Sequence, residues 1–225
     1  MHSSYYDIMY GLCGILNYLS IFKDQKEINA LIYRELENLV NITNEIKIYD
    51  TNVPGWYIPM KNQFSDIEKN LYPEGNFNTS LSHGTAGLLT FFSLMLEKNI
   101  QIKGQVEAME KIVDFYFTYK LNDGKRDFWQ GQIGLSEFLN KKIDEKNIYR
   151  RDAWCYGSPG ICYSIIRAGK ILNKTEWVDY GISNLKCTIN DIQGIFSPTF
   201  CHGYSGIYQI LNSIEQLIGT QIFLK

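Results

Sequence analysis

The segment His202-Gly203-Tyr204-Ser205-Gly206-Ile207 has a pattern that occurs four times in this chain. Each copy has Tyr or His, then Gly-x-x-Gly, then Ile or Leu, and the first glycines are separated by 73, 73 and 46 residues. An almost wholly apolar segment follows each copy, and a helix that is apolar around most of its circumference is expected to be buried. The other copies are Tyr10–Ile15, His83–Leu88 and Tyr156–Ile161, and the apolar segments are Ile15–Phe22, Leu88–Leu96, Ile161–Leu172 and Ile207–Ile218.

A second, more charged segment follows each of the first three apolar segments. Glu27–Ile42 and Val106–Tyr119 place their apolar residues on one helical face, and Glu176–Ile189 is a weaker example. The repeating unit is therefore a helical hairpin with one buried and one half-exposed helix. Stacked hairpins of this kind form an all-α solenoid, or a closed ring whose buried helices make an inner wall.

The glycines of the motif indicate where functional residues gather. Glycine lets the chain turn sharply into a helix and lets neighbouring backbones approach closely. The residue before the first glycine then lies at the mouth of an inner helix. In a ring all such residues point to the same end, so we expect His83, Tyr156 and His202 to lie near one another.

Two stretches interrupt the repeat. Tyr49–Ser82 is rich in Pro, Gly and Asn, and Asn122–Arg151 is polar and charged. Both are too long for simple connections, and insertions on the motif face are where a substrate groove would be built. A near-match to the motif, Gln130–Leu135, lacks the Tyr or His, and we interpret it as chance.

Composition excludes several classes of function. The 225 residues suffice for one large domain, and a net charge of −2 gives no basic surface for nucleic acid. No apolar stretch reaches the ~20 residues of a membrane span. The N-terminus has no basic and apolar segments typical of a signal peptide, so we predict a cytoplasmic protein.

The five cysteines form no regular framework, which favours reduced thiols. Cys13, Cys162 and Cys187 lie in apolar or amphipathic runs and are predicted to be core thiols. Cys155 and Cys201 instead lie in Gly-rich turns before a helix.

Cys155, Cys201 and His202 are candidate zinc ligands. Cys201 and His202 are adjacent in a turn, where consecutive side chains can converge, and Cys155 occupies the equivalent place before the preceding copy. Two thiolates and one imidazole suit zinc, and three protein ligands leave the open position typical of a catalytic site. The alternative is that the three are ordinary buried residues without a metal.

Three further residues have both a chemical and a structural interpretation. His83 holds the same motif position as His202, and it is either an acid/base group or a histidine that caps a turn. Arg151 either orients a carboxylate or stabilises an enolate, or it is an exposed arginine in a polar loop. Asp7 is either a helix-mouth carboxylate or an N-terminal cap.

These residues resemble those of the lanthionine synthetase C-like family, the zinc-dependent cyclases of lanthipeptide biosynthesis. Trp154-Cys-Tyr-Gly157 followed downstream by Cys201-His-Gly203 is the specific combination, and Gly55-Trp-Tyr-Ile-Pro59 is similar to the stand-alone cyclases. The other matching stretches are Tyr6–Ile15, Asn76–Gly87, Arg151–Gly160 and Phe200–Gly206, so the resemblance spans nearly the whole chain.

The resemblance implies an α/α toroid with zinc held by Cys155, Cys201 and His202. A cysteine thiol of a dehydrated, leader-bearing precursor peptide would be activated there and would add to dehydroalanine or dehydrobutyrine. His83 would be the acid/base group, and Asp7, Arg151 and Tyr156 match other positions around the site. A dehydratase and an export transporter are the implied partners, with membrane association only through such a complex.

The chain departs from the family in length. Family members have further helices before the first motif and after the last, so we expect residues 1–225 to form one partial domain, an incomplete ring truncated at both ends. A non-catalytic scaffold that binds zinc and a peptide or glutathione is therefore the alternative to a cyclase. A glycosidase on the same architecture is disfavoured, because it needs paired carboxylates and only Asp7 lies at a helix mouth.

Overall fold

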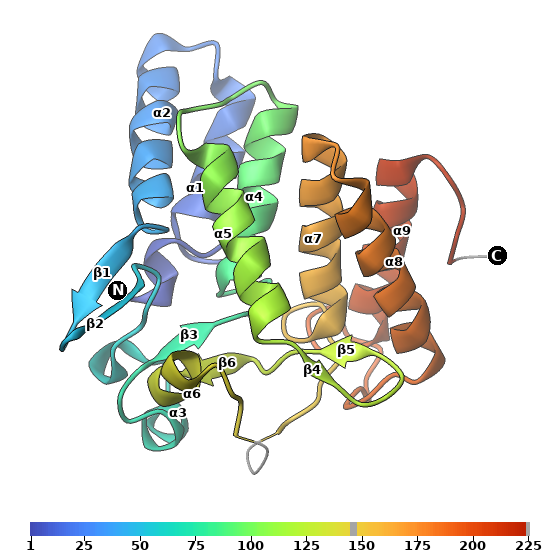
Figure 1. The fold of residues 1–225 in the computed structure, drawn as a ribbon. Coiled ribbons are helices and arrows are strands. Elements are labelled where there is room, and N and C mark those ends of the chain that lie inside the picture. The colour runs from blue at the N-terminus through green and yellow to red at the C-terminus, as the bar shows by residue number, and fades with distance from the viewer. Residues whose placement is uncertain (145–147, 224–225) are drawn as a thin grey trace.

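The computed structural model describes residues 1–144 and 148–223, and it consists mainly of helices (Figure 1). As predicted, each copy of the motif leads into a helix. These four helices, which we call the inner helices, stand in a row in chain order, because α4 contacts α1 and α7, and α7 also contacts α9. Their bounds are Leu12–Leu19 (α1), Thr85–Glu97 (α4), Ser158–Leu172 (α7) and Tyr204–Ile218 (α9).

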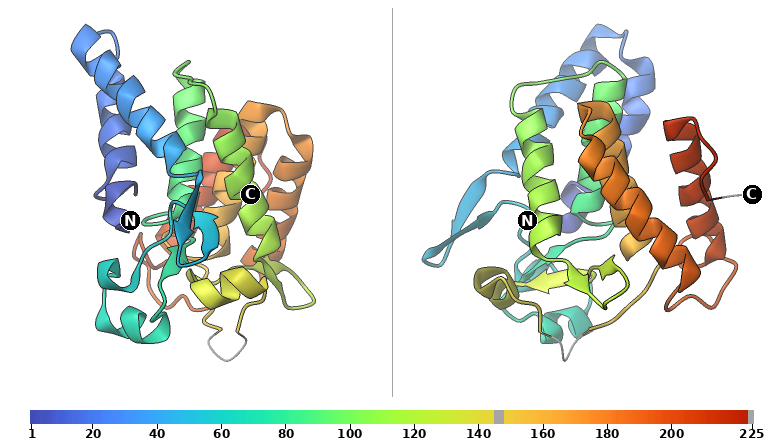
Figure 2. Two further views of the ribbon diagram at one scale, coloured as in Figure 1. Left: turned by 60° about the vertical axis from the view of Figure 1, so that its left-hand side comes forward. Right: turned by 45° about the vertical axis from the view of Figure 1, so that its right-hand side comes forward.

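An outer helix packs on each of the first three inner helices. The outer helices are α2 (Lys26–Asn41), α5 (Gln105–Thr118) and α8 (Thr175–Asn190), and they contact α1, α4 and α7 respectively. The predicted hairpins are therefore confirmed. Three hairpins and α9 form a double layer of helices, an incomplete α/α toroid (Figure 2).

The inner helices differ in how completely they are covered. In α4, ten of the thirteen residues are buried. This helix is therefore covered on most sides, as its almost wholly apolar sequence predicts. The helices at the two ends of the row expose part of their apolar surface instead. Ile15 and Tyr18 of α1 are 51% and 61% exposed, and Tyr208 of α9 is 58% exposed.

The two insertions form short strands and helices that lie together at the lower end of the helices in Figure 1. They are joined by an antiparallel pairing of β3 with β6, in which Phe77 lies opposite Ile133. The near-match Gln130–Leu135 runs through β6 into a short helix, so it lies outside the repeat. Outside the inner and outer helices, the elements of the described chain are β1 (Glu45–Ile48), β2 (Thr51–Pro54), α3 (Asp66–Leu71), β3 (Asn76–Asn78), β4 (Leu121–Asn122), β5 (Asp127–Phe128), β6 (Gln132–Gly134) and α6 (Leu135–Asn140), with 3-10 turns at Ser3–Tyr5, Ser20–Phe22 and Met60–Asn62.

One prediction about the cysteines was wrong. Cys13 and Cys162 are fully buried, as expected of core thiols, but Cys187 is exposed. The buried stripe of α8 contains Trp177, Gly181 and Leu185, and Cys187 is two residues beyond Leu185, about 200° around the helix. In the described part of the chain no helix combines the length and apolarity of a bilayer span.

Candidate metal centre

The glycines of the motif are required by the path of the chain into each inner helix. At seven of the eight motif glycines, an added Cβ would lie within 2.7 Å of the carbonyl oxygen six residues earlier. The tightest case is Gly157, which also has a φ of +115° and a Cβ position 1.7 Å from the Arg151 oxygen. Any side chain here would displace the loop that carries the candidate ligands, since glycine alone tolerates both demands.

The same glycines also set the distance between neighbouring repeats. An added Cβ on Gly87, Gly160 or Gly206 would approach the side chain of Ile8, Leu81 or Trp154, respectively, at 2.6–3.0 Å. Each of these side chains lies three residues before the first glycine of the preceding motif. The turns of successive repeats therefore contact each other in the same way.

Backbone hydrogen bonds join three of the four turns. The Leu81 amide donates to the Cys155 carbonyl at 2.9 Å, and the Cys155 amide donates to the Cys201 carbonyl at 3.3 Å. His83 therefore lies two residues from a bond to the Cys155 turn, and His202 lies one residue from the next bond. This pairing gathers the candidate residues at one rim of the inner layer.

Cys155, Cys201 and His202 converge on one point. One ligand atom from each, the two Sγ atoms and an imidazole nitrogen, lies within 4.8 Å of the others. Cys201 Sγ and His202 Nε2 are 3.7 Å apart, although the two residues are neighbours in sequence. Cys155 is buried at the base, Cys201 is half-buried and His202 is exposed, so the site is reached from the solvent side.

The chemistry of these donors fits a divalent cation. Burial raises the pKa of the Cys155 thiol, and the neighbouring Cys201 thiol adds to this effect. Two close thiols cannot both ionise readily at neutral pH without a positive charge beside them. A metal ion would supply that charge, and two thiolates with one imidazole match the softness and ligand number of zinc.

His83 and Asp7 form a hydrogen-bonded pair beside the first two turns. His83 Nδ1 lies 2.7 Å from Asp7 Oδ2, and the carboxylate is fully buried. The other oxygen, Oδ1, accepts the amides of Met9, Tyr10 and Gly11 at 3.0, 2.6 and 2.8 Å. Burial opposes ionisation of Asp7, but the hydrogen bonds from His83 and from the Tyr10 and Gly11 amides lower its pKa below the ordinary value.

Aromatic rings enclose the His83 imidazole. The Tyr10 ring is stacked on it with centroids 5.7 Å apart, and the Phe64 ring lies at 5.2 Å on a tilted plane. Phe64 comes from the first insertion, so this insertion completes the surroundings of a residue in the repeat. The side chain keeps 22% exposure, which leaves the imidazole accessible to a bound molecule.

Tyr156 and Arg151 line a cleft of about 350 Å³ between the two insertions and the third motif. The other lining residues are Leu71, Tyr72, Trp129, Gln130, Gly131, Gln132, Tyr149 and Gly157. In the described residues, the lining of this cleft includes neither His83 and Asp7 nor the three candidate ligands. The predicted site residues thus form three groups on the motif face: Cys155 with Cys201 and His202, His83 with Asp7, and Tyr156 with Arg151. Cys155 and Tyr156 are adjacent in sequence, which connects the first group to the third, and the backbone bonds between the turns connect the first group to the second.

Asn78 is a residue of this region that the sequence did not single out. Its Nδ2 donates to the Tyr156 hydroxyl at 3.0 Å, and its Oδ1 accepts the Ser80 amide. Asn78 thereby connects the loop before His83 to the side chain next to Cys155. In the sequence, Asn78 is marked only by its position shortly before the second motif, and the structure places it in β3.

Comparison with known proteins extends over the whole chain. The model of the family "Lanthionine synthetase C-like protein" matches residues 1–225. The nisin biosynthesis protein NisC of Lactococcus lactis subsp. lactis is 31% identical over 220 residues, which cover 97% of this chain and 51% of NisC. A solved structure of nisin cyclase matches with a TM-score of 0.90 and 30% identity, over 98% of this chain and 54% of that one. The chain therefore spans about half the length of these relatives.

Proposed function

The chain belongs to the lanthionine synthetase C-like family, and on that premise we propose that it is a zinc-dependent peptide cyclase that forms thioether rings. The substrate in this proposal is a precursor peptide that contains cysteine together with dehydroalanine or dehydrobutyrine. The observation that carries the proposal is the convergence of Cys155, Cys201 and His202 within 4.8 Å, on turns that are bonded to the turn of His83.

Cys155, Cys201 and His202 would hold the zinc ion. When bound, zinc lowers the pKa of a thiol at its open position, so that a nucleophilic thiolate is available at neutral pH. The protein supplies the geometry for this. Cys155 is fixed by backbone bonds on both sides of its turn, and His202 faces the solvent from which a peptide arrives.

His83 would move the proton that the addition requires. The sulfur forms a bond to the β-carbon, the double-bond electrons move toward the carbonyl, and the α-carbon must then gain the proton that the thiol has lost. Asp7 binds Nδ1 of His83, which fixes the orientation of the ring and leaves Nε2 for proton transfer. The lowered pKa of Asp7 keeps the carboxylate ionised for this role.

The cleft beside Tyr156 would bind the peptide around the reacting residues. Four of its ten lining residues are aromatic, and Arg151 contributes a cation. The aromatic residues are Tyr72, Trp129, Tyr149 and Tyr156. The Arg151 guanidinium is 3.0 Å from the Tyr149 hydroxyl and keeps part of its surface free for a peptide carbonyl or enolate oxygen. Both insertions contribute to the walls, in keeping with their place on the motif face.

The proposal includes the wider setting. The dehydrated precursor would be bound through its leader, in the cytoplasm, with a dehydratase and an export transporter as partners. Family membership supports the peptide substrate, while the two partner proteins rest on the sequence resemblance alone.

Metal analysis and a thiol assay test this function. Purified protein should contain about one zinc per chain, and Cys201→Ala should contain almost none. Incubation with a dehydrated precursor peptide, followed by alkylation of free thiols, should show the thiols consumed. A wild-type protein without zinc would contradict the central claim, and zinc with persistent thiols would support the non-catalytic zinc- and peptide-binding scaffold.

A further inference from the structure

A buried ion pair lies close to the Cys155 turn in the chain. Arg126 comes from the turn between β4 and β5, and Asp152 lies three residues before Cys155. Arg126 Nη1 and Nη2 bind Asp152 Oδ1 and Oδ2 at 3.0 and 2.6 Å, a bidentate arrangement. The two side chains are 1% and 3% exposed, so water contributes almost nothing to their solvation.

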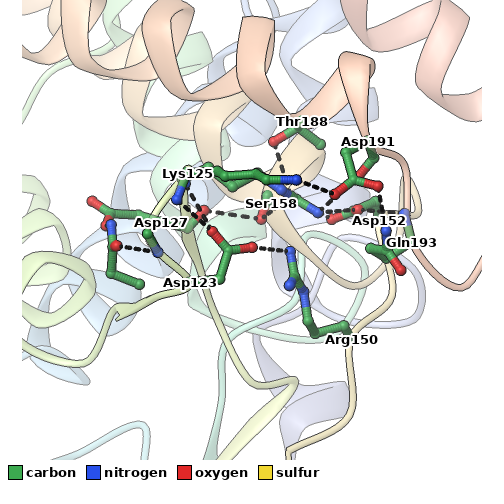
Figure 3. A network of polar contacts seen from close by, with 12 residues as sticks. Asp123, Lys125, Asp127, Arg150, Asp152, Ser158, Thr188, Asp191 and Gln193 are labelled. Atoms are coloured by element: carbon green, nitrogen blue, oxygen red, sulfur yellow. Dashed lines mark hydrogen bonds and ion pairs between the residues drawn. The ribbon is translucent and has the colours of Figure 1, made fainter.

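The pair also binds the chain that leads into the Cys201 turn. Arg126 donates to Thr188 Oγ1 at 3.0 Å and to the Asp191 carbonyl at 3.2 Å, both at the end of α8. The network around Asp152, Thr188, Asp191 and Gln193 is shown in Figure 3. One arginine from an insertion thus joins the end of α8, the third outer helix, to the loop before Cys155.

Asp152 and Gln193 reinforce this connection through the backbone. The Gln193 amide donates to Asp152 Oδ2 at 2.8 Å, and the Asp152 amide donates to the Gln193 carbonyl at 2.9 Å. Gln193 lies in the connection between α8 and the turn of Cys201 and His202. The loops of all three candidate ligands are therefore attached to one buried carboxylate.

A buried ion pair is weak support for stability, because desolvation of two charges offsets their attraction. A fork of two parallel hydrogen bonds does fix direction and distance, and lysine cannot reproduce it. In metal sites, the groups that hold the ligands in place commonly change metal affinity by 10- to 100-fold when they are substituted. The placement of this pair on both ligand loops matches such a role.

We propose that Arg126 is a positioning residue, which acts through Asp152 to hold Cys155 at the correct distance from the Cys201–His202 turn. The inference rests on the proposed metal site. It adds a residue of the second insertion, outside the repeat, to the parts that determine metal affinity. Arg126 touches none of the reacting groups in this proposal and influences them through the two loops.

The test compares Arg126→Lys with a matched control, Arg167→Lys. Arg167 also binds a carboxylate, Glu97, but it lies nine residues into α7, toward the end away from the motif turns. Zn²⁺ and Co²⁺ affinities are measured by competition with a chromophoric chelator, together with the Co²⁺ absorption spectrum and thermal unfolding. We expect Arg126→Lys to lower metal affinity at least tenfold and to alter the Co²⁺ spectrum, while Arg167→Lys leaves both unchanged.

A metal-free measurement separates this inference from the zinc proposal. Phenylarsine oxide condenses with two thiols that lie close together and releases water, so its affinity reports the spacing of Cys155 and Cys201. The assay uses a Cys187→Ser background, because that thiol is exposed. Arg126→Lys should weaken arsenical binding about as much as metal binding, whether or not zinc is the natural ion.

The proposal is overturned if Arg126→Lys keeps the metal affinity, the Co²⁺ spectrum and the arsenical affinity of the wild type, even with lower thermal stability. If the wild type contains no metal but Arg126→Lys still binds the arsenical more weakly than Arg167→Lys does, only the zinc site is overturned.

Discussion

His83 and His202 occupy the same position of the same motif, yet their surroundings differ. His202 is exposed and lies beside two thiols, whereas His83 is half-buried against a carboxylate and between two aromatic rings. The residue before each histidine is Cys201 in one turn and Ser82 in the other. A shared backbone thus holds one imidazole beside two thiols and the other against a buried carboxylate.

The difference shows that the repeat sets position and that neighbouring residues set chemistry. Asp7 reaches His83 from the preceding repeat, and Cys155 reaches His202 from the preceding repeat in the same manner. Each candidate group therefore depends on two adjacent turns. Substitutions that affect one histidine should leave the other group intact.

Removal of the buried ligand should have the largest effect. In Cys155→Ala we expect zinc affinity to fall by on the order of 100-fold or more. Zinc-finger peptides bind zinc with roughly 10–16 kcal/mol through four protein ligands, which is on the order of 3 kcal/mol per ligand. Thioether formation should then fall to background. Zinc content after dialysis and the alkylation assay measure the two effects. Cys187→Ser is the control, and stoichiometric zinc in Cys155→Ala would contradict the assignment of this ligand.

Substitution of the other histidine should separate catalysis from metal binding. We expect His83→Asn to lower the rate of thioether formation by about 10²- to 10⁴-fold, the usual contribution of general acid–base catalysis. Its zinc content should equal that of the wild type, since His83 is not among the converging donors. His2→Asn is a matched control, because His2 packs against the Phe64 ring, as His83 does, but belongs to neither group. A loss of zinc in His83→Asn would mean that the two histidines act as one site.

Much of this arrangement follows from the sequence, because it depends on periodicity. The spacing of the glycines and the apolar segments after them predict the inner helices and the common rim of His83, Tyr156 and His202. The reason is steric and local, since most motif glycines lie against a carbonyl six residues earlier. What the converging residues bind and catalyse stays a prediction.

Other parts of the site depend on contacts that leave no periodic signal. Arg126 is one of several charged residues in a polar stretch, and only the fold shows that it is buried against Asp152. The pairing of β3 with β6 joins segments more than fifty residues apart, and Asn78 in β3 bonds Tyr156 across 78 residues of sequence. Cys187 was misplaced because its presence in an amphipathic run does not show on which side of the helix it lies, and the buried stripe passes through Trp177, Gly181 and Leu185 instead.

Asp7→Asn should give the smallest effect, and it shows up as a change in the pH dependence of stability. The asparagine oxygen can still accept the three backbone amides, but the side-chain amide cannot accept a bond from His83 Nδ1. The folded-state pKa of Asp7 is lowered, so the ionised carboxylate stabilises the fold fully at pH values well above the ordinary Asp pKa of 3.8. This stabilisation is lost as pH falls through the folded-state pKa. At neutral pH we expect the substitution to lower the free energy of unfolding by about 1.5–3 kcal/mol, the range for a hydrogen bond to a charged group.

Denaturant unfolding of both proteins between pH 2 and about pH 7 measures this effect, and their free energies of unfolding should converge at low pH. Asp50→Asn, at a fully exposed carboxylate, should keep the wild-type pH profile. Little or no difference between Asp7→Asn and wild type at any pH would show that Asp7 acts only as a turn cap, and that the orientation of His83 depends on its aromatic neighbours.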